Sequence, residues 1–505
     1  MSWEPELEEL RRRQAFAEEM GGAQKVARQH GRGKMDARAR LAGLVDAGSF
    51  REIGKIAGKG SYDEDGNLVH AAPANFIFGR ANIEGRPVVA SADDFTVRGG
   101  AADASIWRKA IQCEQMAHTL KLPLIRMIDG TGGGGSVKML EDIGATYVPA
   151  TPGWGDVVKN LDSVPVVALS LGPTAGLGAA RVVASHYSVM VKGLSQLFAA
   201  GPAVVEALGE IRDKEGLGGS EIHTRNGVVD DEVATEFEAF ARARRFLSYL
   251  PSHVGEAAAR VVGSDPAGRR EDSLVSIVPR DAKRVYSMRK VIEAVFDRGS
   301  VFEMGALWGR AAITAFARLD GWPVALLASD PSFLGGSWEA RTSEKVERFV
   351  KLADQFRLPI VHLVDNPGFM IGHAAESSGT IRYGVNAMNA IYRATVPLAS
   401  VIVRRAYGIA GSAMSNAESF QYRFAWPSGD WGSLPIEGGI EVAYKAELEA
   451  AEDYDAHLAG IRDRLNRVRS PFRTAERFGI EDIIDPRDTR PLLCEFAELA
   501  WRVLP

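Results

Sequence analysis

"LPLIRMID", residues 122–129, and "LPIVHLVD", residues 358–365, are the two stretches that decide the fold. Each is an apolar run with β-branched residues that follows Leu-Pro and ends on Asp, a pattern typical of a buried strand. The chain around them repeats itself. Residues 85–129 and 321–365 share thirteen identical positions without a gap, where background composition gives roughly three. A repeat of this length indicates a duplicated domain and not a solenoid unit.

Both halves follow one plan. An apolar run after a Gly-x-Pro-Val turn leads to an Asp and a Gly-Gly, and a segment with helical periodicity comes next. The Leu-Pro run follows, and then a third apolar run after Val-Pro. Alternating strands and helices predict an α/β layered domain built from a repeated ββα or βαβ unit. The matching segments are Val88–Ala90 and Val324–Leu327, Ile106–Thr119 and Glu344–Phe356, and the Val-Pro pairs at 164–165 and 396–397.

The boundary between the halves is expected in a polar segment with Pro and Gly, residues 265–281. We predict two domains, residues 1–262 and residues 263–505. Residues 1–45 read as helices, and the first of them is a charged amphipathic helix unlike a signal peptide.

Composition excludes several classes of protein. The 505 residues carry a net charge of −5, which gives no reason to expect nucleic acid or an anionic membrane as the main partner. Cys113 and Cys494 are the only cysteines, so a disulfide framework and a four-cysteine zinc site are excluded. The sequence contains no run of about 18 apolar residues, so we expect no membrane span. We expect a cytoplasmic protein with no metal site.

The stretch "MIDGTGGGGSVK", residues 127–138, invites a nucleotide-phosphate interpretation, because four glycines follow a strand. A phosphate-binding loop needs Gly-Lys-Ser/Thr after its spacer, and here Ser136 and Val137 follow Gly135. A dinucleotide fingerprint fits only because poly-glycine matches it trivially. The sequence therefore disfavours a nucleotide here.

Side-chain catalysis also finds little support. There is no Gly-x-Ser-x-Gly and no His-Glu-x-x-His, and His186 and His362 sit in apolar runs, as core histidines do. Glycine-rich loops after strands remain, at paired places in the two halves. Backbone N–H groups at a following helix can stabilise a developing negative charge. The alternative for each loop is that its glycines only allow a tight turn. The loops are residues 130–135, 172–178, 365–372 and 407–411.

The ordered motifs "GRGKMDARARL", "DDFTVRGGA", "GPTAG", "LFAAGPAVV", "LGGSEIHTRNGVVD", "DNPGFMIG", "ATVPLASVIVRRAYG" and "AWPSG" resemble the carboxyltransferase (β) subunits of biotin-dependent acyl-CoA carboxylases, of which propionyl-CoA and methylcrotonyl-CoA carboxylases are examples. The resemblance runs from about residue 31 to the C-terminus. It implies two tandem crotonase-like domains of the ClpP/crotonase superfamily. It also implies a homohexamer, with acyl-CoA on the N-terminal domain of one subunit and carboxybiotin on the C-terminal domain of its neighbour.

The same resemblance implies a partner. A biotin carboxylase and biotin carrier α-subunit would deliver carboxybiotin, in an α6β6 complex. This chain lacks the Met-Lys-Met biotinylation signature and an ATP-binding module, so the partner is needed for the complete reaction. The implied chemistry removes the α-proton of an acyl thioester and carboxylates that carbon, with two oxyanions held by backbone N–H pairs.

Site residues follow from the resemblance position by position. The oxyanion donors are expected at Gly176, Leu177 and Gly178 in the first half, and at Ile409 and Ala410 in the second. The residues expected to line the acyl-CoA and biotin site are Gly132, Gly133, Gly134, Gly368, Phe369, Tyr407, Gly408 and Ser412.

Several positions depart from the family pattern. Leu177 and Ile409 stand where the family has glycine, so their N–H groups can serve only if φ is negative there. Gly411 and Ser412 stand where the family has Tyr and an Asp that shapes the acyl pocket in propionyl-type members. These smaller residues suggest a pocket of different shape, for a larger or more polar acyl group.

Three interpretations stay open. The favoured function is acyl-CoA carboxylation. A carboxyltransferase of a biotin-dependent decarboxylase would run the same chemistry backwards, and a non-catalytic scaffold would keep only the oligomer and the cleft. Lys109 and Lys345, a symmetric pair, either face CoA phosphates or acidic partners, or lie on solvated helix faces.

Overall fold

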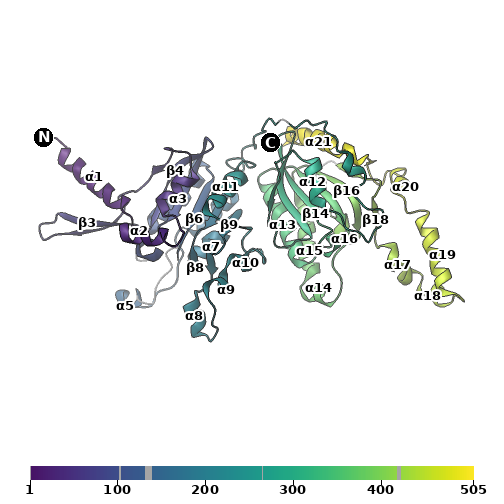
Figure 1. Ribbon diagram of the computed structural model, residues 1–505, viewed down its shortest axis with the longest axis horizontal. Coiled ribbons are helices and arrows are strands. Elements are labelled where there is room, and N and C mark those ends of the chain that lie inside the picture. The colour runs from purple at the N-terminus through teal and green to yellow at the C-terminus, as the bar shows by residue number, and fades with distance from the viewer. Residues whose placement is uncertain (1, 102–103, 131–138, 264, 418–421, 505) are drawn as a thin grey trace. The chain divides into compact units, whose positions relative to one another are not determined.

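The computed structural model describes residues 2–101, 104–130, 139–263, 265–417 and 422–504. Contacts divide the chain into two compact units, Met1–Glu256 and Ala257–Pro505, called here the N-unit and the C-unit. Each unit is built on its own β-sheet with helices packed against it (Figure 1). No helix within the described ranges is long and apolar enough to cross a membrane.

The N-unit sheet has seven strands in the order β1-β4-β5-β6-β7-β9-β11. β1, β4 and β5 pair antiparallel, and every later pair is parallel. The strands β6 (Leu124–Ile128) and β7 (Val166–Ser170) lie side by side in it, and all their residues are buried, as the apolar runs predict. The strands are β1 (Arg51–Glu52), β4 (Phe76–Ile83), β5 (Arg86–Asp93), β6 (Leu124–Ile128), β7 (Val166–Ser170), β9 (Tyr187–Val191) and β11 (Asp231–Val233).

Helices cover both faces of this sheet. Val89, Leu124 and Val166 pack against Cys113 and Ala117 of α4 (Trp107–Leu120) on one face. On the other face, Tyr187 stacks on Phe246 of α11 (Glu236–Leu247). The other elements of this unit are α1 (Glu4–Glu18), α2 (Ala23–His30), α3 (Ala37–Leu44), α5 (Met139–Ile143), α6 (Trp154–Ser163), α7 (Leu177–Val183), α8 (Pro202–Ala207), α9 (Lys214–Gly218), α10 (Ser220–His223), β2 (Gly58–Tyr62), β3 (Leu68–Pro73), β8 (Pro173–Ala175) and β10 (Gln196–Phe198).

The C-unit repeats this design with the order β12-β13-β14-β15-β16-β17-β19, while β18 pairs with the end of β16. β12, β13 and β14 pair antiparallel, and the remaining pairs are parallel. The strands are β12 (Phe302–Met304), β13 (Ala312–Leu319), β14 (Trp322–Ser329), β15 (Ile360–Asn366), β16 (Leu398–Tyr407), β17 (Tyr422–Ala425), β18 (Asp430–Gly432) and β19 (Asp482–Ile483).

Its sheet is also covered on both faces. Phe316 meets Phe349 of α13 (Ala340–Gln355) on one face, while Ala315 and Ala317 pack in the cluster with α12 and α21 on the other. A small apolar cluster of Ile440, Leu448 and Ile461 holds α17, α18 and α19 together, apart from the sheet (Figure 1). The helices are α12 (Met288–Val295), α14 (His373–Ser377), α15 (Thr380–Arg393), α16 (Gly408–Ser412), α17 (Ile436–Ala443), α18 (Lys445–Glu449), α19 (Tyr454–Asn466), α20 (Pro471–Ala475) and α21 (Thr489–Val503).

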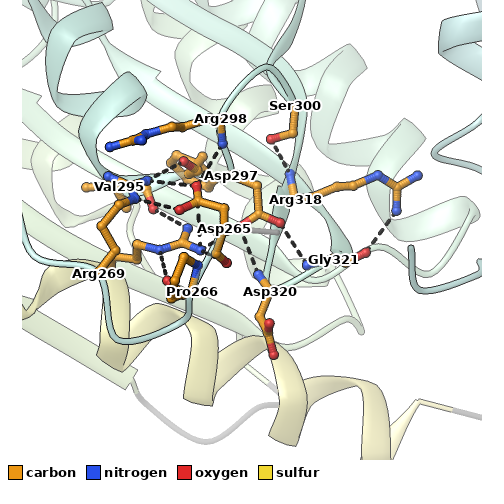
Figure 2. Close-up of polar contacts among 12 residues, drawn as sticks. Asp265, Pro266, Arg269, Val295, Asp297, Arg298, Ser300, Arg318, Asp320 and Gly321 are labelled. Atoms are coloured by element: carbon orange, nitrogen blue, oxygen red, sulfur yellow. Dashed lines mark hydrogen bonds and ion pairs between the residues drawn. The ribbon is translucent and has the colours of Figure 1, made fainter. Parts of the chain in front are cut away.

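The duplication extends to hydrogen bonds that the sequence match does not cover. Each antiparallel hairpin closes with a two-residue turn, and one aspartate before it binds both turn amides. Asp46 accepts from the Glu84 and Gly85 amides at 2.9 and 2.8 Å. Asp297 accepts from the corresponding amides, those of residues 320 and 321, at 3.0 and 2.7 Å (Figure 2).

The segment after residue 264 is fixed to the C-unit by the same network. Arg490, 1% exposed, forms an ion pair with Asp297 at 2.8 Å and donates to the Asp265 and Pro266 carbonyls at 3.0 Å. Arg269 binds Asp265 and also donates to the Phe296 carbonyl (Figure 2). The sequence predicts a polar boundary in this stretch. In the structure, its charged residues Asp265 and Arg269 form hydrogen bonds that hold it against the rest of the C-unit.

Candidate active site

A glycine with positive φ begins a strand-to-helix turn at matching places in the two units. Gly176 follows β8 with φ +58, and Gly408 follows β16 with φ +60. Side chains with a Cβ rarely adopt this conformation, so the paired glycines are required by the turn itself. Leu177 and Ile409, one residue later, lie in the helices that follow and outside the left-handed region. Leucine and isoleucine are therefore compatible with these positions, and their N–H groups meet the requirement that φ not be positive.

The N-unit turn leaves three amides at the start of α7. The Gly176 N–H donates to the Phe198 carbonyl at 3.1 Å, within the pairing of β8 and β10. The Ala180 N–H donates to the Gly176 carbonyl at 3.0 Å. The amides of Leu177 and Gly178, with that of the residue after them, have no acceptor in the part of the chain that the structure describes, as expected of a first helical turn.

The C-unit turn has the same form. Ile409 is 59% exposed, while Ala410 is buried beneath it. Neither of their amides has an acceptor among the described residues. The Ser412 hydroxyl donates to the Ile409 carbonyl at 2.7 Å and so closes the turn from its far end.

Tyr407 directly precedes this turn and is 3% exposed. Burial, together with the neighbouring Asp430 carboxylate, raises the pKa of Tyr407, so the phenol stays protonated. Asp430 is itself paired with Arg469, at 2.7 Å between Oδ1 and Nε. β18 brings Asp430 to this place by pairing with β16, where Tyr407 lies opposite Gly432.

Two buried aspartates lie at matching strand ends: Asp129 directly follows β6, and Asp365 is the last residue but one of β15. Asp129 binds Arg40 at 2.8 Å and Lys34 at 2.5 Å, both supplied by the "GRGKMDARARL" motif. The cations of Asp365 come instead from the end of β16, with Arg405 Nε at 2.7 Å. Both carboxylates are completely buried, and each joins the end of its strand to the loops around it.

The Gly-Gly of each half lies directly against these strand ends. A Cβ built on Gly100 would lie 3.2 Å from the Asp129 carbonyl, and one on Gly336 would lie 2.4 Å from the Asp365 carbonyl. Only bare backbone fits in this space. The glycines are thus explained by close approach of protein backbone, without a ligand.

The remaining predicted residues are placed as follows. Gly132, Gly133 and Gly134 lie outside the described residues. Gly368 is buried, and its amide donates to the Asn366 side chain at 2.9 Å. Phe369 is half-buried beside α15, where a Cβ on Gly384 would come within 2.4 Å of its ring.

The C-unit turn borders a pocket of about 180 Å³, whose lining includes Gly408, Gly411 and Ser412. Gly408 and Ser412 are residues that the sequence predicted for the site, and Gly411 is one of the noted departures from the family pattern; the sequence did not predict the opposite wall, which includes Trp431 and Ile480. Neither residue was predicted for the site, because β18 and the chain before β19 bring them to the turn from distant parts of the sequence.

The symmetric lysines are not on solvated faces, so that alternative is wrong. Lys345 is 3% exposed and donates to the Trp308 and Ala312 carbonyls at 3.2 and 2.8 Å. Lys109 is 7% exposed, and its ammonium has no hydrogen-bond acceptor within the described ranges. Burial lowers the pKa of Lys109 to about 8. The Lys345 ammonium is already bound to two carbonyls of its own unit.

Comparisons with known proteins agree over the whole chain. A family model described as "Carboxyl transferase domain" matches residues 28–504. The carboxyltransferase subunit of propionyl-CoA carboxylase from Haloferax mediterranei is 32% identical over 498 residues, covering 97% of this chain and 95% of that protein. The alpha subunit of methylmalonyl-CoA decarboxylase from Veillonella parvula is 32% identical over 492 residues, covering 96% and 94%.

A solved structure is similar over both units. The crystal structure of transcarboxylase 12S, a hexamer assembly with methylmalonyl-coenzyme A and methylmalonic acid bound, has a TM-score of 0.88 and 31% identity. The match covers 100% of this chain and 96% of that one. The predicted α/β fold of two crotonase-like domains is confirmed. The chain belongs to the carboxyl transferase family of enzymes, as do the carboxyltransferase subunits of propionyl-CoA carboxylases.

Proposed function

We propose that this chain is the carboxyltransferase subunit of a biotin-dependent acyl-CoA carboxylase, which moves a carboxyl group from carboxybiotin to the α-carbon, or vinylogous carbon, of an acyl-CoA. The observation that carries the proposal is the pair of matching turns, each with unpartnered backbone amides, in a member of this family. Such amides suit a reaction that develops negative charge on oxygen.

The two turns are assigned to two oxyanions. The amides of Leu177 and Gly178 hold the thioester oxygen as the acyl α-carbon loses its proton. The amides of Ile409 and Ala410 hold the carbonyl oxygen of the biotin ring. Gly176 keeps the first turn in place, since its own amide is bonded to the Phe198 carbonyl.

Bound carboxybiotin supplies the carboxyl group and the base that takes the α-proton. When bound, it would give up the carboxyl group from its ring nitrogen to the α-carbon, and the same nitrogen would accept the proton that the α-carbon loses. The chain contributes position and charge stabilisation. Two turns with free backbone amides suit this role, because the amides stabilise negative charge and no side chain has to act as acid or base.

The domains and partners follow the same proposal. Residues 1–262 bind the acyl-CoA, and residues 263–505 bind the biotin, with Gly132, Gly133, Gly134, Gly368, Phe369, Tyr407, Gly408 and Ser412 around the two ligands. A biotin carboxylase and carrier subunit delivers the carboxybiotin. The hexamer described for transcarboxylase 12S supports a homo-oligomer here.

Biotin-dependent decarboxylation is a second candidate, favoured by the 32% identity to the methylmalonyl-CoA decarboxylase subunit. The same turns serve both directions. The direction is decided by the partner: a biotin carboxylase drives carboxylation, whereas a membrane decarboxylase subunit drives the reverse. A purely structural role loses its main support, because Leu177 and Ile409 keep their amides in usable conformations.

The decisive test supplies a biotinylated α-subunit, ATP, bicarbonate and a panel of acyl-CoAs to the purified chain. Carboxylated acyl-CoA is the expected product. The α-subunit is first shown to carboxylate biotin on its own. If that control succeeds and no acyl-CoA is carboxylated, carboxylation is excluded.

Leu177→Pro and Ile409→Pro test the oxyanion assignment. Proline is well accepted in the first turn of a helix and lacks the N–H, so each variant deletes one donor with little cost to folding. We expect kcat to fall about 10²–10³-fold for each. Leu177→Ala and Ile409→Ala keep the amide and are the matched controls, expected within about threefold of the parent. Equal effects of proline and alanine at both positions would contradict the assignment.

A further inference from the structure

The short helix that begins with the Leu177 and Gly178 amides is held at its other end by a buried arginine. Arg126 lies on β6 and is completely buried. Its Nη1 donates to the Ala184 carbonyl at 2.7 Å and to the Arg181 carbonyl at 3.3 Å. The last carbonyls of a helix have no donor within the helix, so this guanidinium supplies the donor that the end of α7 lacks.

The guanidinium of Arg126 is itself fixed from two helices. Its Nε and Nη2 donate to the two carboxylate oxygens of Glu114 on α4, at 2.8 Å each. The side-chain amide of Asn160, on α6, donates to the same carboxylate at 2.8 Å. Burial raises the pKa of Glu114, but the charge and hydrogen bonds of Arg126 outweigh it and the net pKa is lowered, so the pair stays ionised.

α7 also binds the sheet through a side chain of its own. The Arg181 guanidinium donates to both carboxylate oxygens of Asp93, at the end of β5, at 3.2 and 3.4 Å. Asp93 in turn accepts from the Asp129 amide at 3.3 Å. The buried face of the helix is apolar, with Val182 in a cluster that includes Ile128. Apolar packing is non-directional, whereas hydrogen bonds define the rotation and position of a short helix.

The fold itself does not require these charges, because the C-unit follows the same plan without them. At the position that matches Arg126 it has His362, whose pKa is lowered to about 3 by burial, so the ring is neutral. A buried ion pair adds little net stability over apolar residues, because both charges lose their hydration. Stability alone therefore does not explain the network. The C-unit residues that match Asp93, Glu114, Arg126 and Arg181 are, in that order, Ser329, Val350, His362 and Ala413.

We propose that Arg126 is a positioning residue for carboxyl transfer: it sets the place of α7, and so of the Leu177 and Gly178 amides that hold the thioester oxygen. The seven residues of α7 span about 10 Å, so a shift at the end of this short helix is passed to its beginning. Misplacing a catalytic group by about 1 Å can lower a rate roughly 100-fold. This inference rests on the proposed function and gives Arg126 a role through the amides, without contact to the substrate.

The test replaces the ion pair by the matching residues of the C-unit, as Glu114→Val together with Arg126→His. Removing one partner alone would leave the other charge buried and unpaired, and lost activity would then reflect unfolding. The assay uses the full chain, an active biotinylated α-subunit and the acyl-CoA that the parent carboxylates best. We expect kcat to fall at least about tenfold, with KM for the acyl-CoA within about threefold of the parent, because the amides act on the oxyanion of the transition state.

A double-mutant cycle separates positioning from a general loss of structure. In the Leu177→Pro background, one of the two positioned amides is already gone. The pair replacement is therefore expected to lower kcat there by only about threefold or less. The matched control, Glu4→Val with Arg11→His, changes an exposed ion pair of the same unit in the same way and is expected to leave kcat unchanged.

Arg126→Lys provides the same test with a milder change. Lysine keeps the positive charge but lacks the planar fork that reaches Glu114 and the helix carbonyls together. We expect kcat to lie between those of the parent and the pair replacement, and the loss to shrink in the Leu177→Pro background. Urea unfolding of each variant shows that the chain is folded under the conditions of the assay.

The two failures are distinguishable. Values of kcat within about twofold of the parent in both Arg126 variants, or the same loss with and without Leu177→Pro, would overturn the positioning role and leave the proposed function standing. A parent chain that carboxylates no acyl-CoA, with the α-subunit shown to be active, would overturn both.

Discussion

At the scale of single residues, Lys109 and Lys345 show how one duplicated position can be used in two ways. The same buried lysine occurs at the same place in α4 and α13. Among the described residues Lys345 has acceptors, the carbonyls of Trp308 and Ala312, whereas Lys109 has none. Lys109 has a pKa lowered to about 8 by burial. A folded-state pKa below the unfolded value of about 10.4 means that folding disfavours the ammonium.

Methionine substitutions should therefore have opposite effects on the two units. Lys109→Met removes a buried, unpartnered charge and is expected to stabilise the N-unit by up to about 3 kcal/mol at pH 7. In the parent, stability should rise between about pH 8 and pH 10, where the unfolded chain binds the proton and the folded chain does not. Lys109→Met should abolish that rise.

Lys345→Met is the matched comparison. It leaves two carbonyls without their donor and is expected to destabilise the C-unit by about 1–3 kcal/mol. Urea unfolding at pH 7 and at pH 9 measures both variants. A loss of stability in Lys109→Met would contradict the interpretation of Lys109 as an unpartnered charge.

At the scale of elements, each hairpin is tied to the chain before it by one aspartate. Hydrogen bonds from the Gly85 and Glu84 amides lower the pKa of Asp46. Asp297 makes the same two bonds and is also paired with Arg490. In each unit, the matching carboxylate thus holds the turn of the antiparallel hairpin against the preceding chain.

Replacing either aspartate by alanine should loosen its own hairpin. Asp297→Ala is expected to cost about 1–3 kcal/mol, because it leaves two amides without their acceptor and removes the nearest carboxylate from the buried Arg490 guanidinium. Asp46→Ala should destabilise the N-unit. The stabilisation from Asp46 is present above its unfolded pKa of about 3.9 and is lost as pH falls through the lower folded value. Urea unfolding at pH 7 and pH 3 checks this: a parent-to-Asp46→Ala difference that does not shrink at pH 3 would contradict it.

The elements also show where sequence patterns succeed. The Leu-Pro and Val-Pro runs predict β6, β15, β7 and β16, because an unbroken apolar run is typical of a strand buried on both faces. The helix predicted at residues 344–356 begins earlier, at Ala340, where the Glu339 side chain binds the first free amides. Two capping hydrogen bonds to one side chain set this end, and hydrophobic periodicity does not detect them.

At the scale of the whole molecule, each unit contains one buried thiol. Cys113 belongs to the core of the N-unit, and Cys494 to that of the C-unit. Burial raises the pKa of the Cys113 thiol and raises that of Cys494 to about 12, so neither is reactive in the folded chain.

Thiol labelling can therefore report on the two units separately. We expect Asp46→Ala and Lys345→Met to expose different cysteines first in rising urea, Cys113 in the former and Cys494 in the latter. Mass spectrometry of labelled peptides measures this, and the parent chain supplies the reference order. Identical labelling of both cysteines in every variant would mean that the two units unfold as one.

The sequence by itself determined the duplication, three buried strands and one helix in each half, and the two glycine turns, because these depend on local periodicity and on backbone conformations that few residues adopt. It did not determine that the Gly176 amide donates to the Phe198 carbonyl. It also did not determine that Lys109, among the described residues, lacks acceptors like those of Lys345. Nor did it determine that Trp431 and Ile480 line a pocket with Ser412. Those facts depend on which distant segments meet. Burial and hydrogen-bond partners exist only once the chain has folded, so only the tertiary structure decided them.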